Sequence, residues 1–371
     1  MINNVDSLVA LVGETPLLRL KSISDAVGVP VFGKCEWMSP GLSVKDRPVA
    51  QMLADANLPP NSLIVEATAG NTGSALCQFA NALGHRVLLT VPDKIAASKI
   101  AQLRALGAEV VLCDTMLPGT DSGHFINTAV RLAAERSGWF ANQFDNASNR
   151  QAHLRTGAEI VRQVGGSADG LVVALATGTG GSAAGIGAHL ASVNGGEPAL
   201  CLIATRGQSI VFDNESKQFV ARSPDVTALE STPPSGLSLE GVGPGKFYAN
   251  LVAAAPFVKR SVLGGPLGDL TAAAMCRFLV RREGIFVGGS AAFNVCAAVL
   301  AARLLHPRVV VTLLCDGGER YLTKQYDDDA VIAAARACGI NDEDLPRFLK
   351  PESLAFMNAM LELNGAAPFL D

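Results

Sequence analysis

The chain has 371 residues, a formal net charge of −4 and only 17% charged residues. With no basic surplus and few aromatic side chains (5%), its composition lacks the electrostatic footprint of a nucleic-acid-binding protein. Hydrophobic residues make up 49% of the chain. We therefore expect a large buried core and no long disordered tail.

Short apolar runs alternate with longer helical patterns along most of the chain. Strands are expected at 29–37, 63–68, 86–92, 108–114, 171–177, 199–205 and 309–316, and helices at 74–84, 96–107 and 124–138. This alternation predicts an α/β protein with parallel sheets and right-handed crossovers. The segment 212–247, rich in Pro, Ser and Gly, is interpreted as a mobile loop region over a cleft, and residues from 326 onward as a helical extension.

Two uncharged runs, 170–193 and 284–302, are about long enough to span a bilayer. Each has its glycines clustered after a short β-branched run, which favours a buried strand, a turn and a buried helix. The eight cysteines are scattered without a C-x-x-C pair, so no metal site is expected. Dispersed cysteines and the lack of a signal-peptide pattern favour a cytoplasmic location.

Three glycine-rich turns stand out: "EATAGNTG" (66–73), "ATGTGGSAAG" (176–185) and "EGIFVGGSAAFN" (283–294). If each follows a strand, they converge at the ligand crevice of an open α/β sheet. The second turn can cradle a phosphate on backbone N–H groups and a helix N-terminus, whereas the first offers hydroxyl and N–H groups to a carboxylate. Taken alone, the second turn could simply be a tight strand-to-helix turn, and the first could be N-capping by Asn71 or Thr72.

Lys45, in "SPGLSVKDRPVA" (39–50), is the lysine that could act beside these turns. Taken alone it reads as an ordinary surface charge. A lysine becomes nucleophilic at neutral pH when its pKa is lowered or when it is held as an imine. A cleft that binds a phosphate, a carboxylate and a further polar atom therefore makes Lys45 a candidate for covalent cofactor attachment.

The ordered motifs "GETPLLRL", "SVKDRP", "EATAGNTG", "QFDNASNRQAHLRTGAEI", "ATGTGGSAAG", "EGVGPG", "EGIFVGGSAAFN" and "CDGGERYL" resemble the cysteine synthase and cystathionine β-synthase family over about residues 8–325. Fungal-type cysteine synthases and bacterial S-sulfocysteine synthases look most similar. The resemblance implies a fold type II enzyme that uses pyridoxal 5′-phosphate. It implies two open, twisted, mostly parallel-sheet domains with flanking helices and the cofactor in the cleft between them. We expect a larger domain from 1–40 plus 155–325, a smaller domain from 41–154 and an extension from 326–371.

The resemblance also implies individual roles. Lys45 matches the Schiff-base lysine and general base, Asn71 the contact to the pyridoxal 3′-oxygen, and Ser290 the partner of the ring nitrogen. The phosphate loop matches Gly178, Thr179, Gly180, Gly181 and Ser182. The substrate-carboxylate site matches Thr68, Ala69, Gly70, Asn71, Thr72 and Gln143, and Gly241 matches the loop near the substrate amine. His153 also matches a family position, where a structural role is favoured.

Some positions depart from the family pattern. Ala69 replaces a common Ser in the carboxylate loop, Ser39 a common Asn, and Ser182 a common Thr. Arg206 stands where many members that use acetylserine carry a Glu-Pro-Thr sequence. The branch that uses phosphoserine resembles this chain in having an Arg at that position. Because an Arg can form two parallel bonds to a phosphate, we expect O-phosphoserine as donor, with O-acetylserine as competitor and a surface salt bridge as the alternative role of Arg206.

The expected reaction is β-replacement on an activated serine through an aminoacrylate, with sulfide or thiosulfate giving cysteine or S-sulfocysteine. Cystathionine formation, desulfhydration or use of an amine are alternatives that share the same steps. A catalytically silent homologue that binds serine acetyltransferase is a further alternative, disfavoured by the intact Lys45, Asn71 and Ser290. The resemblance favours a homodimer.

Overall fold

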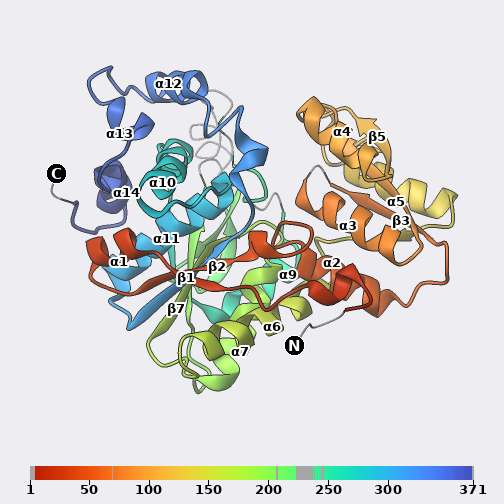
Figure 1. The fold of residues 1–371 in the computed structure, drawn as a ribbon, viewed down its shortest axis with the longest axis horizontal. Helices are drawn as coiled ribbons and strands as arrows, with labels where there is room; N and C mark the ends of the chain where they lie inside the picture. The colour runs from red at the N-terminus through yellow and green to blue at the C-terminus, as the bar shows by residue number, and fades with distance from the viewer. Residues whose placement is uncertain are drawn as a thin grey trace.

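The computed structural model describes residues 5–68, 70–205, 208–222, 237, 239–243 and 246–369. Two separate sheets carry the α/β architecture, one of six strands and one of four (Figure 1). The predicted fold class, with mostly parallel sheets and flanking helices, is confirmed.

The larger sheet has the order β1-β2-β12-β7-β8-β11, and only the edge strand β1 runs antiparallel to its neighbour. Central strand β12 pairs with β2 on one side and with β7 on the other, so that Val310 faces Val31 and Val309 faces Leu171. Strands buried on both faces read as continuous apolar runs, which is why the sequence signals them so clearly. The bounds are β1 Leu17–Arg19, β2 Val31–Cys35, β7 Leu171–Ala176, β8 Leu200–Ala204, β11 Val258–Leu263 and β12 Val309–Leu314.

The smaller sheet is fully parallel, in the order β5-β4-β3-β6. In Figure 1 its helices α3, α4 and α5 lie together, well apart from α10 to α14. The strands are β3 Leu63–Ala67, β4 Arg86–Pro92, β5 Glu109–Cys113 and β6 Trp139–Phe140, and the helices are α2 Asp46–Ala56, α3 Asn71–Ala82, α4 Ala97–Ala105 and α5 Phe125–Glu135.

The main core lies where two long helices pack against the larger sheet. Residues 289–302 of α11 are all buried, because small alanines let this helix approach the strands closely. Helices α12 and α13 of the C-terminal extension pack on α10, and the 3-10 turn Ala355–Met357 between α13 and α14 contributes the buried side chains of Phe356 and Met357 to the same core. The remaining helices are α1 Lys21–Val27, α6 Ala147–Gln163, α7 Gly181–Val193, α9 Ala249–Val252, α10 Gly268–Glu283, α11 Gly289–Leu305, α12 Asp328–Ala337, α13 Pro346–Leu349 and α14 Asn358–Leu363.

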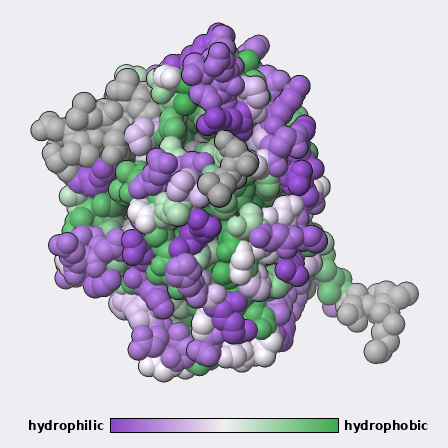
Figure 2. Space-filling model, turned by 90° about the vertical axis from the view of Figure 1, so that its left-hand side faces the viewer, coloured by the Kyte–Doolittle hydropathy of each residue, from purple (hydrophilic) through white to green (hydrophobic). Residues whose placement is uncertain are grey.

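The surface on the left-hand side of Figure 1, where the extension lies, is turned toward the viewer in Figure 2. Hydrophilic residues predominate on this face, and hydrophobic ones lie among them in smaller patches. Apolar side chains of the extension, such as Phe348 and Phe356, are buried in the core to which α10 also contributes. Within the described ranges, no helix is long and apolar enough to cross a membrane.

Two sequence-based expectations need correction. The run before Ser290 does not form a strand: among the described residues its sheet-like pairing is one isolated bridge, between Val287 and Gly317. The third glycine-rich turn therefore follows an extended segment tied to the residues after β12. The segment 212–247 is also not wholly loop, since a hairpin of β9 Ile210–Asp213 and β10 Gln218–Ala221 extends into it, while 223–236 lie outside the described residues.

Candidate active site

A cavity of about 550 Å³ is lined by the ends of strands from both sheets. This volume lies within the range typical of small-molecule and cofactor sites. Most of the site residues expected from the sequence line it: Lys45, Thr68, Gly70, Asn71, Thr72, Gln143, Gly178, Thr179, Gly180, Ser182, Gly241 and Ser290. Gly181 begins helix α7 behind the cradle rather than lining the cavity, and Ala69 and Arg206 lie outside the described residues.

Lys45 is held at the end of the central strand by backbone pairing. Val44 N–H donates to the Cys315 carbonyl at 2.8 Å, and Ser43 bridges Asp316. Lys45 then caps the start of α2, so the turn has little freedom. Its half-buried side chain lines the cavity, and its ammonium group has no hydrogen bond or ion pair to any residue that the structure describes.

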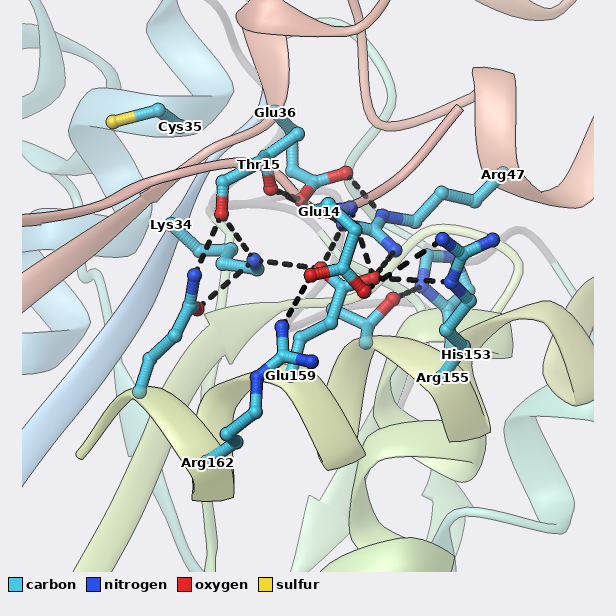
Figure 3. A network of polar contacts seen from close by, with 12 residues as sticks. Glu14, Thr15, Lys34, Cys35, Glu36, Arg47, His153, Arg155, Glu159 and Arg162 are labelled. Carbon is cyan, nitrogen blue, oxygen red and sulfur yellow. Dashed lines mark hydrogen bonds and ion pairs between the residues drawn. The ribbon is translucent and has the colours of Figure 1, made fainter. Parts of the chain in front are cut away.

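A buried ionic network anchors the helix that follows Lys45 (Figure 3). Arg47 donates to Glu36 on one side (Nε to Oε2, 2.6 Å) and to Glu159 on the other (Nη2 to Oε2, 2.7 Å). Lys34 Nζ reaches the same Glu159 oxygen at 2.7 Å. Burial alone would raise the pKa of Glu159, but Arg47 and Lys34 outweigh it and hold that pKa at about 2. The network joins β2, α2 and α6 and so fixes the direction from which Lys45 enters the cavity.

The phosphate-type cradle follows β7, as predicted. Gly180 has a φ of +88°, and a Cβ there would lie 2.3 Å from the Leu251 Cα, so only glycine fits. A Cβ on Gly178 would lie 2.4 Å from the Gly241 carbonyl oxygen. Thr179 Oγ1 accepts a hydrogen bond from Asn149 Nδ2 at 3.1 Å, which orients its hydroxyl. The cradle ends at the N-terminus of α7, where backbone N–H groups and the helix dipole favour an anion.

His153 touches this cradle, which the sequence interpretation missed. The imidazole is fully buried, and its Nε2 lies 3.0 Å from Ser182 Oγ while its Nδ1 lies 3.1 Å from Thr156 Oγ1. Burial, together with the nearby Arg47 and Lys45, holds the pKa of His153 well below its ordinary value, so the ring is neutral. The i, i+3 spacing of His153 and Thr156 on α6 was the available signal, but the pairing with Ser182 is a tertiary contact.

The carboxylate-type subsite is formed by the first turn and by Gln143. Thr72 Oγ1 donates to Gln143 Oε1 at 2.6 Å, and the Gln143 backbone N–H donates to Glu66 Oε2 at 3.1 Å. Glu66 also accepts the Ala67 N–H at 2.9 Å. The Gln143 side chain is thus fixed from behind, with its neighbours Thr68 and Gly70 at the cavity wall.

The lining of the cavity is rich in cations. Lys94, Lys99, Arg320 and Lys324 line it together with Lys45. The carboxylate among the described lining residues is Glu240, which bridges Lys99 on α4 and Lys324, the latter at 2.7 Å. This bridge connects the two sides of the cavity next to Gly241.

The chain matches the family model described as pyridoxal-phosphate dependent enzyme over residues 8–316. The chain belongs to this family. It is 36% identical over 334 residues to a cysteine synthase of Dictyostelium discoideum, covering 86% of this chain and 84% of the relative. It is 33% identical to a probable cysteine synthase of Bacillus subtilis, covering 87% of this chain and 98% of that protein.

Among solved structures, an O-ureido-L-serine synthase is similar, with a TM-score of 0.70 and 28% identity over 89% of this chain and all of that one. A hydrogen sulfide-producing enzyme from Fusobacterium nucleatum also has a TM-score of 0.70, with 25% identity over 86% of this chain and 98% of that one. These comparisons confirm the family resemblance, the fold type and the pyridoxal-phosphate cofactor. The chain is a β-replacing enzyme of the cysteine synthase kind.

The cavity fits this cofactor. The cradle after β7 can hold a phosphate, and Ser290, at the start of α11 and largely buried, can face a ring nitrogen. Lys45 supplies an amine with no competing partner in the described part of the chain. When bound, pyridoxal phosphate withdraws electrons from the Cα of an amino acid.

Proposed function

We propose that this enzyme replaces the leaving group of an O-activated L-serine with a sulfur nucleophile, sulfide or thiosulfate. O-Phosphoserine is the favoured donor and O-acetylserine the competitor, and the products are cysteine or S-sulfocysteine. The observation that supports this most strongly is the shared cavity. It brings the amine of Lys45 together with a phosphate-type cradle and a separate carboxylate-type subsite.

In this proposal Lys45 carries the cofactor, the cradle from Gly178 to Ser182 holds its phosphate, and Ser290 faces its ring nitrogen. A hydroxyl at Ser290 leaves that nitrogen largely unprotonated, which favours elimination over transamination. Thr68, Thr72 and Gln143, with Ala69 and Gly70, hold the substrate carboxylate. The freed Lys45 Nζ then removes the Cα proton, and the leaving group departs from Cβ.

The cationic lining of the cavity supports an anionic substrate. Lys94, Lys99, Arg320 and Lys324 face the cavity against one carboxylate, Glu240. Several like charges around a partly desolvated cleft raise the local concentration of anions. The phosphate leaving group of O-phosphoserine and thiosulfate are both anions.

The direct test mixes the enzyme with O-phosphoserine, O-acetylserine or serine, each with sulfide, thiosulfate, homocysteine or ammonia. Products are identified by mass spectrometry. We expect consumption of an activated serine and a product with a new C–S bond. If none of these donors is consumed by cofactor-loaded enzyme, the proposal is wrong.

The likeness to a hydrogen sulfide-producing enzyme supports a second candidate, desulfhydration of cysteine. The two functions differ in direction, since one consumes sulfide and the other releases it. Incubation with cysteine alone, with sulfide measured, separates them. Cystathionine formation or use of an amine would appear as product with homocysteine or ammonia.

The role of Arg206 is tested by substitution. Arg206→Ala should raise the KM for O-phosphoserine about tenfold or more, because a bidentate charged contact is lost, and leave the KM for O-acetylserine nearly unchanged. An unchanged KM for O-phosphoserine would assign Arg206 to a surface role.

The assembly and domain bounds remain predictions. We propose a homodimer with a domain of 1–40 plus 155–325, a domain of 41–154 and the extension 326–371. Light scattering of the purified protein, alone and with a serine acetyltransferase, tests the homodimer and that possible partner.

A further inference from the structure

The amide of Asn71 lies between a carboxylate and a guanidinium. Asn71 Nδ2 donates to Asp316 Oδ2 at 2.7 Å, and Asn71 Oδ1 accepts from Arg320 Nη1. Asn71 begins α3 of the smaller sheet, whereas Asp316 and Arg320 follow strand β12 of the larger one. The contact therefore joins the two sides of the cavity at a residue that lines it.

These two charges determine which way the amide points. The opposite flip would place an amide oxygen against the Asp316 carboxylate and an NH₂ group against the Arg320 guanidinium, pairing acceptor with acceptor and donor with donor. The observed orientation gives both Asp316 and Arg320 a hydrogen-bonding partner on the amide. It uses one hydrogen of Nδ2 and leaves the second without an acceptor among the described residues.

Asp316 is a buried hydrogen-bond acceptor that its neighbours hold in one orientation. It is fully buried, and its Oδ2 also accepts the Tyr321 hydroxyl at 2.7 Å. Its Oδ1 faces Gly288, where an added Cβ would lie 2.3 Å away, and it has no hydrogen-bond partner among the described residues. Burial raises the pKa of Asp316, while the hydrogen bonds from Asn71 and Tyr321 and the charges of Arg320 and Lys45 oppose that rise.

A purely structural carboxylate would be expected to have both oxygens satisfied, because an unpaired buried acceptor is costly. Here all the hydrogen bonds from side chains go to the oxygen that also holds Asn71. Among the described residues, the mostly buried Arg320 also donates to the Gly41 carbonyl at 3.4 Å and lies 3.8 Å from the exposed carboxylate of Glu319. The hydrogen bond of Arg320 to the Asn71 amide is therefore its closest contact with these groups.

We propose that Asp316 and Arg320 are positioning residues that lock the Asn71 amide with its free N–H available to the bound cofactor. Asn71 donates that hydrogen to an oxygen acceptor on the pyridoxal ring, and neither Asp316 nor Arg320 touches the ring itself. The proposal rests on the proposed function and on the cofactor contact that the family resemblance implies for Asn71.

The experiment measures cofactor affinity and the absorption maximum of the bound cofactor, without substrate, in Asn71→Ala, Asp316→Asn and Arg320→Gln and in the double variant Asn71→Ala/Asp316→Asn. Each single variant should weaken cofactor binding roughly tenfold and move the absorption maximum in the same direction. The double variant should be no worse than Asn71→Ala, because Asp316 acts through Asn71. Glu319→Gln is the matched control, since it removes the other carboxylate near Arg320, and it should behave as the parent enzyme.

Distinct results contradict distinct claims. If Asn71→Ala changes both readouts while Asp316→Asn and Arg320→Gln change neither, or if the double variant is additive, the positioning role is wrong. If Asn71→Ala itself leaves both readouts unchanged, the assignment of Asn71 to the cofactor fails first and the positioning role falls with it. Circular dichroism establishes that each variant is folded. If Asp316→Asn does not fold, the test uses Arg320→Gln and the double variant Asn71→Ala/Arg320→Gln instead.

Discussion

A buried carboxyl, Glu66, supports the Gln143 loop at the wall of the cavity. Glu66 has no exposed surface and accepts backbone N–H groups from Ala67 and Gln143. Burial nevertheless outweighs these bonds and raises its pKa to about 7. The carboxyl that supports the Gln143 loop therefore changes charge close to neutral pH.

This shift predicts a pH dependence of stability. In the unfolded chain Glu66 titrates near its ordinary value of 4.5. Between that pH and about 7 the folded protein holds one more proton than the unfolded chain, so stability falls as pH rises through this window. Glu66→Gln should flatten this dependence by on the order of 1–3 kcal/mol, as measured by urea unfolding at pH 5 and pH 8. Asp46 has a similarly raised pKa and keeps part of the slope.

Glu135→Gln, at an exposed site on α5, is the control and should keep the parent slope. An unchanged slope in Glu66→Gln would show that Glu66 is already ionised at low pH.

At the scale of elements, the ionic network of Figure 3 sets the place of α2. Its charges come from three elements: Lys34 and Glu36 at the end of β2, Arg47 in α2 and Glu159 in α6. Each of these side chains is almost fully buried. Because a buried charge is costly without its partner, the three elements are held in one relative arrangement, with Lys45 two residues before Arg47.

Removing one charge from this network should be strongly destabilising. Glu159→Gln leaves Lys34 and Arg47 with one carboxylate between them, and should lower the free energy of unfolding by about 3–5 kcal/mol. The exposed pair of Arg131 and Glu135 provides a contrast, since Glu135→Gln should cost less than about 0.5 kcal/mol. Chemical denaturation of both variants tests this, and equal losses would mean that burial of the network adds nothing.

At the scale of the whole molecule, the sequence predicts the sheets better than the site. Buried parallel strands such as 171–176 and 309–314 are continuous apolar runs, so their positions follow from local pattern. The prediction of a strand before Ser290 was wrong, because an apolar run beside a glycine turn can also be an extended segment with a single bridge. Local pattern does not distinguish these two.

In the site, too, some residues can be predicted from local sequence and others cannot. Lys45, Asn71, the glycine cradle and Ser290 carry motifs that can be recognised from sequence, and they line one cavity. The contacts of His153 with Ser182 and of Asp316 with Asn71 join residues 29 and 245 positions apart. No local periodicity reports such contacts, so these supporting residues emerge only from the fold.

The C-terminal extension belongs to the core of the whole molecule. Phe356 is 3% exposed, and its ring centroid lies 6.0 Å from that of Phe278 in α10. Phe356→Ala should therefore lower the free energy of unfolding by about 3–5 kcal/mol. Leu322→Ala, at a side chain that is 59% exposed, should cost less than about 0.5 kcal/mol. Similar midpoints in thermal denaturation for the two variants would contradict a structural role of the extension.

The central claim is that Lys45 carries the cofactor, and one measurement tests it directly. The cofactor-loaded enzyme is reduced with borohydride and digested, and the peptide that retains the pyridoxyl group is sequenced by mass spectrometry. Our account predicts the group on the peptide that contains Lys45, and no labelled peptide from Lys45→Ala. Labelling of Lys34, Lys99 or another lysine in the parent enzyme, with Lys45 unmodified, would contradict it.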